Sequence, residues 1–187
     1  ENMTKVTVNV SPLEIGKELN ITLTLDNTNE PVSGSNTVSV TVNKDYNWVS
    51  LGTGTFADVL AFTEKPYNVE IQKADGFDRY RVMKPYEQGL KNDDGGWGNA
   101  VASTSCDYIE FWIKDGIIYY NIGINYDGSA SNAIYAHHPS DFAGISLANN
   151  KQLYDKTFQL APYYYIEALQ GGFDYTGEGG SILITLP

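Results

Sequence analysis

Hydrophobic and polar residues alternate with a period of two along the N-terminal part of the chain. The pattern runs through residues 6–10 and repeats over 19–25 and 38–42, where valine, isoleucine or leucine occupies every second position. This alternation predicts three β-strands, each with one apolar and one polar face. Three such strands cannot form a sandwich core alone, and they need a second sheet either from the rest of this chain or from residues that precede Glu1. We therefore interpret residues 1–45 as an Ig-like β segment that belongs to a longer N-terminal domain.

Lys44 and Asp45 mark a boundary, after which the sequence predicts a second domain. Residues 46–187 hold short apolar or alternating segments separated by Gly, Asn, Asp and Pro, and we expect them to form a larger antiparallel β-sandwich. The predicted strands are Asn47–Leu51, Tyr67–Lys73, Arg79–Met83, Tyr108–Lys114, Ile117–Ile124, Phe158–Ile166 and Ser181–Leu186.

Turn signals predict how some of these strands connect. Asp115-Gly116 lies between two alternating runs and is typical of a hairpin whose type I′ turn needs positive φ at both positions. A second hairpin is expected between Phe173–Tyr175 and Ser181–Leu186, through the glycine-rich residues that separate them. Helical periodicity is limited to single turns over Ala57–Phe62 and Pro139–Phe142. The sequence therefore predicts an all-β fold, a small Ig-like antiparallel sheet followed by a larger sandwich.

The charge of the chain narrows the classes of partner. The 187 residues carry a formal net charge of −11. Phosphate backbones repel such a surface, and no cluster of Lys and Arg offsets it, so nucleic acid is a poor partner. Anionic lipids and acidic polysaccharides are disfavoured for the same reason. Neutral ligands, cations and basic proteins remain, and the charge by itself also keeps a protein in solution.

The single cysteine, the longest apolar stretch and the first residue each allow a further prediction. Cys106 has no second cysteine to pair with, so we expect a buried, unreactive thiol. The longest apolar stretch, Ile117–Ile124, is too short to cross a bilayer, and no transmembrane segment is predicted. The chain begins at Glu1 without an initiator Met, so we expect a processed piece of a longer protein.

Four segments resemble a known group of proteins. They are W-V-S-L-G-T-G-T-F-A-D (Trp48–Asp58), V-E-I-Q (Val69–Gln72), Y-R-V-M-K-P-Y (Tyr80–Tyr86) and the ending G-G-F-D-Y…I-L-I-T-L-P (Gly171–Pro187). With L-T-L-D and T-V-S-V-T-V in residues 23–42, the resemblance covers nearly the whole chain. The group is the secreted or surface-lipoprotein β-domains of gut Bacteroidetes, in which an Ig-like or Calx-β-like segment precedes such a domain.

This resemblance implies a location and no defined activity. It implies export, attachment of the full-length protein to the outer membrane, and company with polysaccharide-uptake machinery. The lipidated N-terminal Cys typical of the group is not in this sequence. We therefore expect an extracellular protein at the outer-membrane surface, anchored through a lipidated segment that precedes Glu1.

The motifs that resemble enzyme signatures lack the context that would support them. Gly52-x-Gly54-x-x-Ala57 has the spacing of a dinucleotide-binding fingerprint, but no helix or βαβ pattern follows, so we interpret it as a turn that closes a strand. His137 and His138 are the only histidines. Neighbours on a strand face opposite ways and cannot easily chelate one metal, and no spacing favours either as a base for Cys106. We expect surface histidines and no cofactor.

Carboxylates are the remaining candidates for chemistry. Glu110, between Tyr108 and Trp112 on one face of a predicted strand, is a candidate acid, but a glycosidase needs a second placed carboxylate. Asp93-Asp94 and Asp127-Gly128-Ser129 offer oxygen ligands for Ca²⁺. Neither fits the spaced calcium-loop pattern, and ordinary turns explain them better. We therefore predict no catalytic residue and no metal site.

The segment Lys91–Ser105, rich in Gly, Asp and Asn, is the predicted binding loop. Trp97 lies between two glycines there, and an exposed indole stacks on apolar faces such as those of sugars. We predict that Trp97 binds ligand, with hydrogen bonds to hydroxyls from Asn92, Asp93, Asp94 and Asn99. The alternative is that Trp97 covers the edge of the core. The run Tyr163–Tyr165 must also place at least one ring outward if it is a strand.

These features together predict a non-enzymatic extracellular β protein that binds neutral carbohydrate at the cell surface. The alternative is a structural or protein-interaction module of a surface assembly, without a small-molecule ligand. A glycan-active enzyme is a third hypothesis, and it requires two acids that face each other across a cleft.

Overall fold

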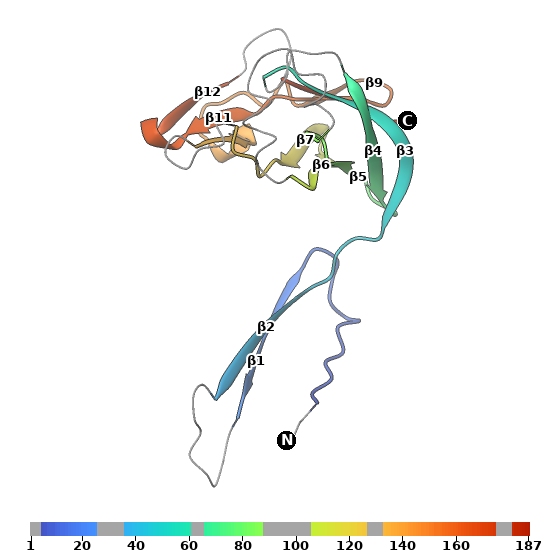
Figure 1. Cartoon of the computed structure of the whole chain (residues 1–187), viewed down its shortest axis with the longest axis vertical. Coiled ribbons are helices and arrows are strands. Elements are labelled where there is room, and N and C mark those ends of the chain that lie inside the picture. Colours follow the sequence, from blue (N-terminus) through green and yellow to red (C-terminus); the bar gives the residue numbers. More distant parts are fainter. Residues whose placement is uncertain (1–4, 26–35, 61–65, 88–105, 127–132, 175–180) are drawn as a thin grey trace. The chain divides into compact units, whose positions relative to one another are not determined.

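The computed structural model describes residues 5–25, 36–60, 66–87, 106–126, 133–174 and 181–187. The chain divides into two compact units, Glu1–Asn47 and Trp48–Pro187 (Figure 1), close to the predicted boundary. The described residues contain strands, turns and two short 3₁₀ helices but no α-helix. All of their strand pairings are antiparallel, which confirms the predicted all-β fold.

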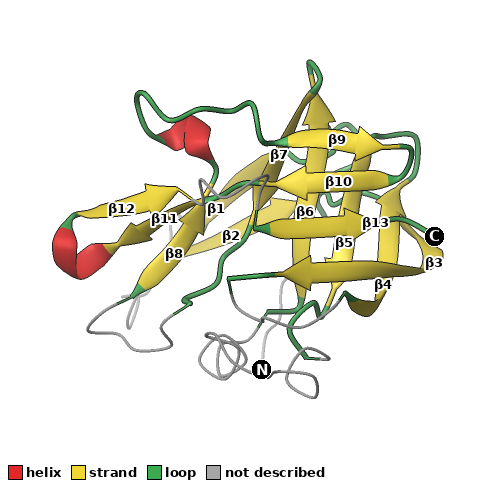
Figure 2. Ribbon diagram, turned by 90° about the horizontal axis from the view of Figure 1, so that it is seen from above, coloured by secondary structure: helices red, strands yellow, loops and turns green. Residues whose placement is uncertain are grey.

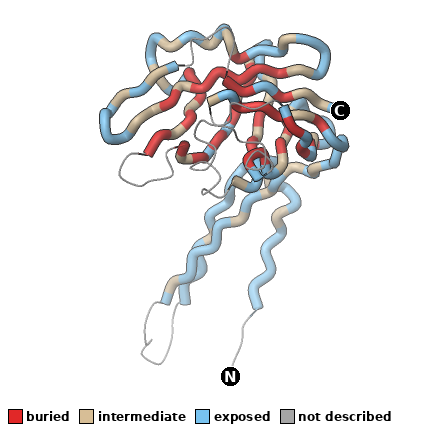
Figure 3. Tube along the Cα trace, turned by 45° about the horizontal axis from the view of Figure 1, so that its top comes forward, coloured by how far each residue is buried: buried red, intermediate tan, exposed pale blue. Residues whose placement is uncertain are grey.

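The first unit contains a two-stranded sheet of β1 (Glu18–Thr24) and β2 (Thr37–Asn43). The register forms the pairs Leu19–Val42, Ile21–Val40 and Leu23–Val38, so one face of this sheet carries the apolar side chains. The opposite face is polar. Figure 3 shows that the described residues of this unit are exposed or half-buried. An isolated two-stranded sheet is only marginally stable in water.

The third strand predicted in this unit, over residues 6–10, is wrong. These residues lie outside any strand and are exposed or half-buried. Alternation determines which side chains share a face, but a strand also needs a neighbour for its backbone N–H and C=O groups. The pattern alone could not show whether such a neighbour exists.

Eight described strands of the second unit form one sheet in the order β7-β6-β5-β4-β3-β13-β10-β9 (Figure 2). The sheet curls so that its two ends meet, since the Ile118 N–H of β7 donates to the carbonyl of Asn150, directly before β9, over 3.1 Å. The bounds are β3 (Trp48–Asp58), β4 (Tyr67–Ala74), β5 (Arg79–Met83), β6 (Tyr108–Lys114), β7 (Ile117–Asn121), β9 (Lys151–Tyr154), β10 (Thr157–Leu160) and β13 (Ile182–Thr185).

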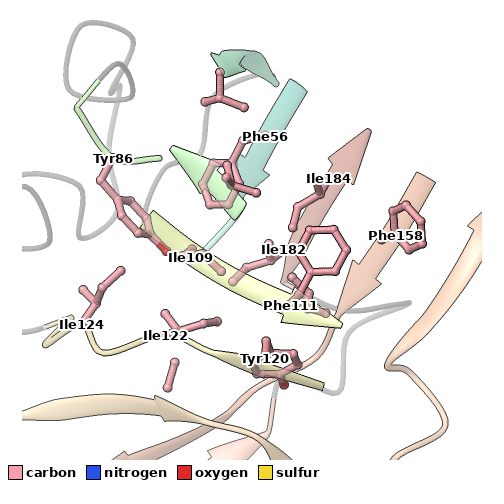
Figure 4. Close-up of a cluster of buried hydrophobic side chains, with 14 of the residues drawn as sticks. Phe56, Tyr86, Ile109, Phe111, Tyr120, Ile122, Ile124, Phe158, Ile182 and Ile184 are labelled. Carbon is pink, nitrogen blue, oxygen red and sulfur yellow. The ribbon is translucent and has the colours of Figure 1, made fainter. Parts of the chain in front are cut away.

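The core lies inside this curled sheet (Figure 4). Phe158 of β10 packs against Phe111 of β6, with ring centroids 5.3 Å apart, and against Tyr80 of β5 at 5.8 Å. Aliphatic residues that are 0% exposed surround these rings: Ile71, Ile109, Ile118, Leu160, Ile182 and Ile184. Opposite parts of the sheet therefore pack face to face, which is the sandwich-like arrangement that the alternating segments predicted.

Three further strands form a smaller sheet in the order β12-β11-β8. They are β8 (Ile134–His137), β11 (Tyr163–Ile166) and β12 (Gly171–Asp174), with the 3₁₀ helices η2 (Pro139–Asp141) after β8 and η3 (Glu167–Leu169) between β11 and β12. Tyr164 faces inward, where its hydroxyl hydrogen-bonds to Ser181 and its ring meets Tyr126 edge-on at 5.2 Å. Tyr163 and Tyr165 are half-buried on the opposite face, as alternation along a strand requires.

Several local predictions are confirmed. β5 and β6 have the predicted bounds. Asp115 and Gly116 have φ values of 53° and 77°, which agree with the type I′ hairpin between β6 and β7. The single turn predicted at Pro139–Phe142 is η2.

Predictions that required knowledge of strand partners are wrong. The predicted strand Phe158–Ile166 is two strands, β10 and β11, in different sheets. The predicted hairpin between Phe173–Tyr175 and Ser181–Leu186 does not form, because β12 pairs with β11 whereas β13 pairs with β10 and β3. The helical turn predicted from Ala57 is wrong where the structure describes it, since Ala57 and Asp58 end β3.

The segment Gly52-x-Gly54-x-x-Ala57 lies inside β3 and not in a turn. Gly52 occupies a β-bulge, where the register with β4 shifts and its φ is 106°, a value that favours glycine. At Gly54 a Cβ would come within 2.3 Å of the Thr185 carbonyl oxygen. The sheet itself therefore requires both glycines, and the strand that continues after them excludes the helix of a dinucleotide site.

Candidate functional site

Arg81 lies between two aromatic rings on the outer face of the large sheet. Its guanidinium carbon is 3.9 Å from the ring centroid of Trp48 and 4.0 Å from that of Tyr108. Arg81 is paired with Glu110 across β5 and β6, and its Nε donates to Glu110 Oε2 over 3.0 Å. Contacts between a guanidinium and a ring face contribute about 0.5–2 kcal/mol each.

Arg79, two residues earlier on β5, repeats this arrangement. Its guanidinium carbon is 4.2 Å from the ring centroid of Trp112, and its Nε donates to Glu110 Oε1. Trp112 in turn stacks on Tyr119 at 6.1 Å. Both oxygens of Glu110 are thus engaged by arginine. We call this set the arginine–aromatic ladder: Trp48, Arg79, Arg81, Tyr108, Glu110, Trp112 and Tyr119.

His138 ends the row of stacked rings. It lies 4.6 Å from the Tyr119 ring and is buried, 6% exposed, so the expected surface position is wrong for this histidine. The Ser140 N–H donates to Nδ1 over 3.2 Å, which leaves Nε2–H to donate to the Ile118 carbonyl over 3.1 Å. Burial lowers the pKa of His138, an effect that the Ile118 carbonyl and Asp141 partly oppose. The ring is therefore neutral at neutral pH and both nitrogens are occupied.

A hollow opens beside the ladder, with a cavity volume of about 370 Å³. We call it the ladder hollow. Its described lining residues combine carboxylates, an amide and a guanidinium with two aromatic rings: Arg79, Cys106, Asp107, Tyr108, Glu110, Trp112, Asn121 and Gly123. The lining offers both donors and acceptors of hydrogen bonds.

Aromatic rings gather on the outer face of the small sheet. Tyr165 is paired with Tyr135, and Tyr163 with His137, so that all four lie on one face. Phe142, which follows η2, packs on this face with ring centroids 4.5 Å from Tyr163, 5.8 Å from Tyr165 and 5.5 Å from His137. His137 and Asp141 approach to 3.9 Å. The five rings are half-buried, so each retains contact with solvent.

A second hollow, of about 360 Å³, lies beside these rings. We call it the tyrosine hollow. Its described lining residues are Asn121, Ile122, Gly123, Tyr135, Ala136, His137, Phe142, Tyr165 and Glu167. A third hollow of about 270 Å³ lies against β3–β5, and none of its described lining residues is aromatic: Thr53, Asn68, Val69, Glu70, Met83, Lys84 and Glu87. Aromatic rings and polar groups therefore meet in the first two hollows.

The ladder hollow and the tyrosine hollow adjoin. Asn121, the last residue of β7, and Gly123 line both. The chain reaches the small sheet directly afterwards, where Asn125 bridges to Tyr135 and its side-chain oxygen accepts from the Ile134 N–H over 3.1 Å. The two hollows together form the candidate site.

A buried polar cluster lies apart from these hollows. The Tyr86 and Tyr126 hydroxyls donate to Asp58 Oδ2 over 2.8 and 2.7 Å, and the Leu60 N–H donates to Oδ1 over 3.0 Å. Burial, reinforced by the charge of Asp58, raises the pKa values of Tyr86, Tyr126 and Tyr164 well above 10. Asp58 is 1% exposed, so the cluster stabilises the fold and is not open to a ligand.

The predicted ligand-binding residues Trp97, Asn92, Asp93, Asp94 and Asn99 lie outside the described residues, as does the candidate calcium segment Asp127-Gly128-Ser129. Sequence reasoning missed Asn121, Tyr135 and Phe142, because only strand pairing brings them together. For Tyr165 the alternation within Tyr163–Tyr165 was the available signal.

Cys106 and Glu110, the two candidates for chemistry, both line the ladder hollow. Burial, with a smaller contribution from Asp107, raises the pKa of the Cys106 thiol to about 12. Its Sγ donates to the Tyr108 carbonyl at 3.6 Å. The thiol is protonated at neutral pH. Cys106 is half-buried, so the expected buried position is wrong, and its low reactivity stays a prediction.

Within the described ranges, no group of three or more His, Cys, Asp or Glu side chains is placed to hold a metal ion. Within the same ranges, no helix has the length and apolar character needed to cross a membrane. Comparisons of the chain with protein-family models, curated proteins and solved structures give no match.

Proposed function

We propose that this protein is a non-enzymatic extracellular β protein that binds a neutral glycan. The observation that supports this most is the tyrosine hollow, where Tyr135, Phe142 and Tyr165 line a cavity together with the Asn121 amide and the Glu167 carboxylate. Ring faces supply apolar contact to the C–H surfaces of a sugar, while amide and carboxylate groups accept or donate hydrogen bonds to its hydroxyls. Ligand sites typically combine an apolar lining with a few placed polar groups.

The charges around the two hollows favour a neutral glycan over an acidic one. Arg79 and Arg81 both form ion pairs with Glu110. The charge of each guanidinium is therefore already compensated before a uronate or sulfate group could bind. Asp107 and Glu167 add carboxylates to the linings, and the net charge of the chain is −11. An anionic glycan would meet repulsion at both positions.

Three arrangements support a function without catalysis. Glu110 has both oxygens engaged by arginine, and His138 has both ring nitrogens occupied. The raised pKa of Cys106 leaves little thiolate at neutral pH. A hydrolase needs a group that is available as nucleophile, acid or base.

The extracellular, outer-membrane location is proposed from the resemblance of Trp48–Asp58 and the other quoted segments, and fractionation of producing cells tests it.

A panel of immobilised neutral glycans, followed by calorimetric titration of those retained, tests the binding function. Tyr165→Ala should weaken binding by about fivefold or more, since stacking on an aromatic ring contributes about 1 kcal/mol or more. The matched control is Tyr154→Ala, which removes a tyrosine that is 76% exposed and lines neither hollow, and it should bind as the wild type does. Melting temperatures measured in parallel separate loss of affinity from loss of fold.

Three results would reject the proposal. If the wild-type protein binds no neutral glycan, the structural or protein-interaction function is the better account, and the exposed apolar face of β1 and β2 is the feature that supports it. If uronate-rich or sulfated glycans bind more tightly than neutral ones, the charge argument is wrong. Turnover of a chromogenic glycoside, abolished by Glu110→Gln, would show an enzyme instead.

A further inference from the structure

Gly123 has no structural reason to be glycine. It is the central residue of a three-residue turn closed by the Ile124 N–H, which donates to the Ile122 carbonyl over 2.6 Å. Its φ is not in the left-handed region, where Gly52 and Gly116 lie. A Cβ built at Gly123 meets no atom within 4 Å. Neither the backbone nor the packing therefore excludes a larger side chain at this position.

Gly123 lies where the absence of a side chain affects the shape of the candidate site. The residue lines the ladder hollow and the tyrosine hollow at once, together with Asn121. A side chain at position 123 would project into open space where the two hollows adjoin. Because glycine has no side chain, nothing at position 123 projects between the two hollows, and one ligand can extend from one hollow into the other.

We propose that the glycan bound here is an oligosaccharide of at least two sugar rings, which occupies both hollows and crosses the chain at Gly123. This inference rests on the proposed glycan-binding function. The hollows measure about 370 and 360 Å³, each near the lower end of the roughly 300–1,000 Å³ of small-molecule sites. Each is therefore suited to a short piece of a glycan, and the pair to a longer one.

The two linings suit different parts of such a chain. The tyrosine hollow offers the rings of Tyr135 and Tyr165 for stacking. The ladder hollow offers the carboxylate of Asp107 and the edges of the ladder for hydrogen bonds. The Asn121 amide, which lines both hollows, can bond a hydroxyl or ring oxygen near the linkage between the rings. Affinity should therefore rise with chain length until both hollows are filled.

Homologous malto-, cello-, manno- and xylo-oligosaccharides, from monosaccharide to hexasaccharide, are the probes. Calorimetric titration of the wild-type protein should show affinity that rises by about tenfold or more with chain length in the series that binds. Gly123→Trp should bind the longer chains no better than the shortest. Gly123→Ala adds only a methyl group between the hollows, and its affinity should still rise with chain length as that of the wild type does.

The results of this experiment distinguish failure of the two-hollow inference from failure of the proposed glycan-binding function. Affinity that does not change with chain length, or Gly123→Trp binding long chains as the wild type does, overturns the inference while the proposed glycan-binding function stands. Absence of binding to every neutral glycan rejects the proposed function itself. The unfolding midpoint of each variant is measured first, and Gly123→Gln replaces Gly123→Trp if the tryptophan variant does not fold. The same comparison of chain lengths then applies.

Discussion

The Tyr126 hydroxyl donates a hydrogen bond of 2.7 Å to the buried carboxylate of Asp58, although 68 residues separate the two in the chain. Tyr86 donates to the same oxygen, and its hydroxyl lies 2.8 Å from that of Tyr126. The cluster joins the end of β3 to the segments that follow β5 and β7. Because a buried carboxylate is costly unless donors surround it, these tyrosines hold three distant segments in one arrangement.

Tyr126→Phe should lower the free energy of unfolding by about 1.5–3 kcal/mol. The substitution keeps the ring and its edge-on contact with Tyr164 but removes a donor from a buried charged group, and hydrogen bonds of that kind contribute about this much. Urea unfolding followed by circular dichroism measures the change. An unaltered midpoint would show that Asp58 does not depend on this hydroxyl.

Tyr120→Phe is the matched control and should act in the opposite direction. The Tyr120 hydroxyl is buried and has no hydrogen-bond partner among the described residues. Removing an unsatisfied buried hydroxyl relieves its desolvation cost, so the free energy of unfolding should rise by about 1 kcal/mol. A destabilisation as large as that of Tyr126→Phe would mean that the hydroxyl is satisfied after all.

Alkaline pH should unfold the protein cooperatively. Burial, with the charge of Asp58, raises the pKa values of Tyr86, Tyr126 and Tyr164 above their ordinary value of about 10. The unfolded chain therefore loses these protons at lower pH than the native protein does. Their contribution to stability is complete below about pH 10 and is lost as the pH rises above it. Tyrosinate absorbance and circular dichroism should change together, whereas ionisation with an intact fold would contradict this.

Local features of the fold could be predicted, because they depend on neighbours in sequence. The bounds of β5 and β6 follow from alternation, and the turn between β6 and β7 follows from Asp115-Gly116, whose positive φ values few other residue pairs accept. The identity of the neighbouring strand depends on residues far away. For this reason the alternating residues 6–10 form no strand, and β12 pairs with β11 instead of β13.

The break between β10 and β11 illustrates a long-range cause. The sequence from Phe158 to Ile166 reads as one apolar strand, but Ala161 N–H donates to the side-chain oxygen of Asn150 over 2.7 Å, and Pro162 has no N–H for a ladder. Asn150 thus holds the chain where it leaves the large sheet for the small one. No local pattern contains this interaction, since it comes from a residue before β9.

The residues of the candidate site could not be predicted as a set. The residues that the sequence named for ligand binding, around Trp97, lie outside the described part of the chain, so that site stays a prediction. The rings that line the tyrosine hollow come from β8, from the residue after η2 and from β11. Only the Tyr165–Tyr135 pairing of β11 with β8 brings them together.

Mild acid should destabilise the protein through His138. Burial lowers its pKa below the ordinary value of about 6.5, and protonation of Nδ1 would remove the acceptor of the Ser140 N–H. The unfolded chain binds this proton at higher pH than the native protein. The stabilising contribution is therefore complete above about pH 6.5 and falls as the pH drops below it. Urea midpoints measured at several pH values should show this slope, and His138→Phe should reduce it.

Glu110→Gln should destabilise the large sheet, because it leaves two neighbouring guanidinium groups without the carboxylate that bridges them. The side chains of Arg81 and Glu110 are each 13% exposed, so the loss should lie between that of surface and fully buried pairs, about 1–3 kcal/mol. Glu87→Gln is the control, since its pair with Lys84 is 63% exposed on both sides and should contribute about 0–1 kcal/mol. Equal effects of the two substitutions would show that the ladder adds little.

Cys106 should react slowly with alkylating reagents in the native protein. The thiolate is the reactive form, and a pKa of about 12 leaves about a thousandth of the thiolate that an ordinary thiol of pKa 9.0 has at the same pH. Alkylation by iodoacetamide at neutral pH should therefore be about a hundredfold or more slower than that of glutathione. In denaturant, burial no longer raises the pKa, and the rate should approach that of the free thiol. A native rate equal to that of glutathione would show that the ladder hollow exposes Cys106 to solvent far more than its burial indicates.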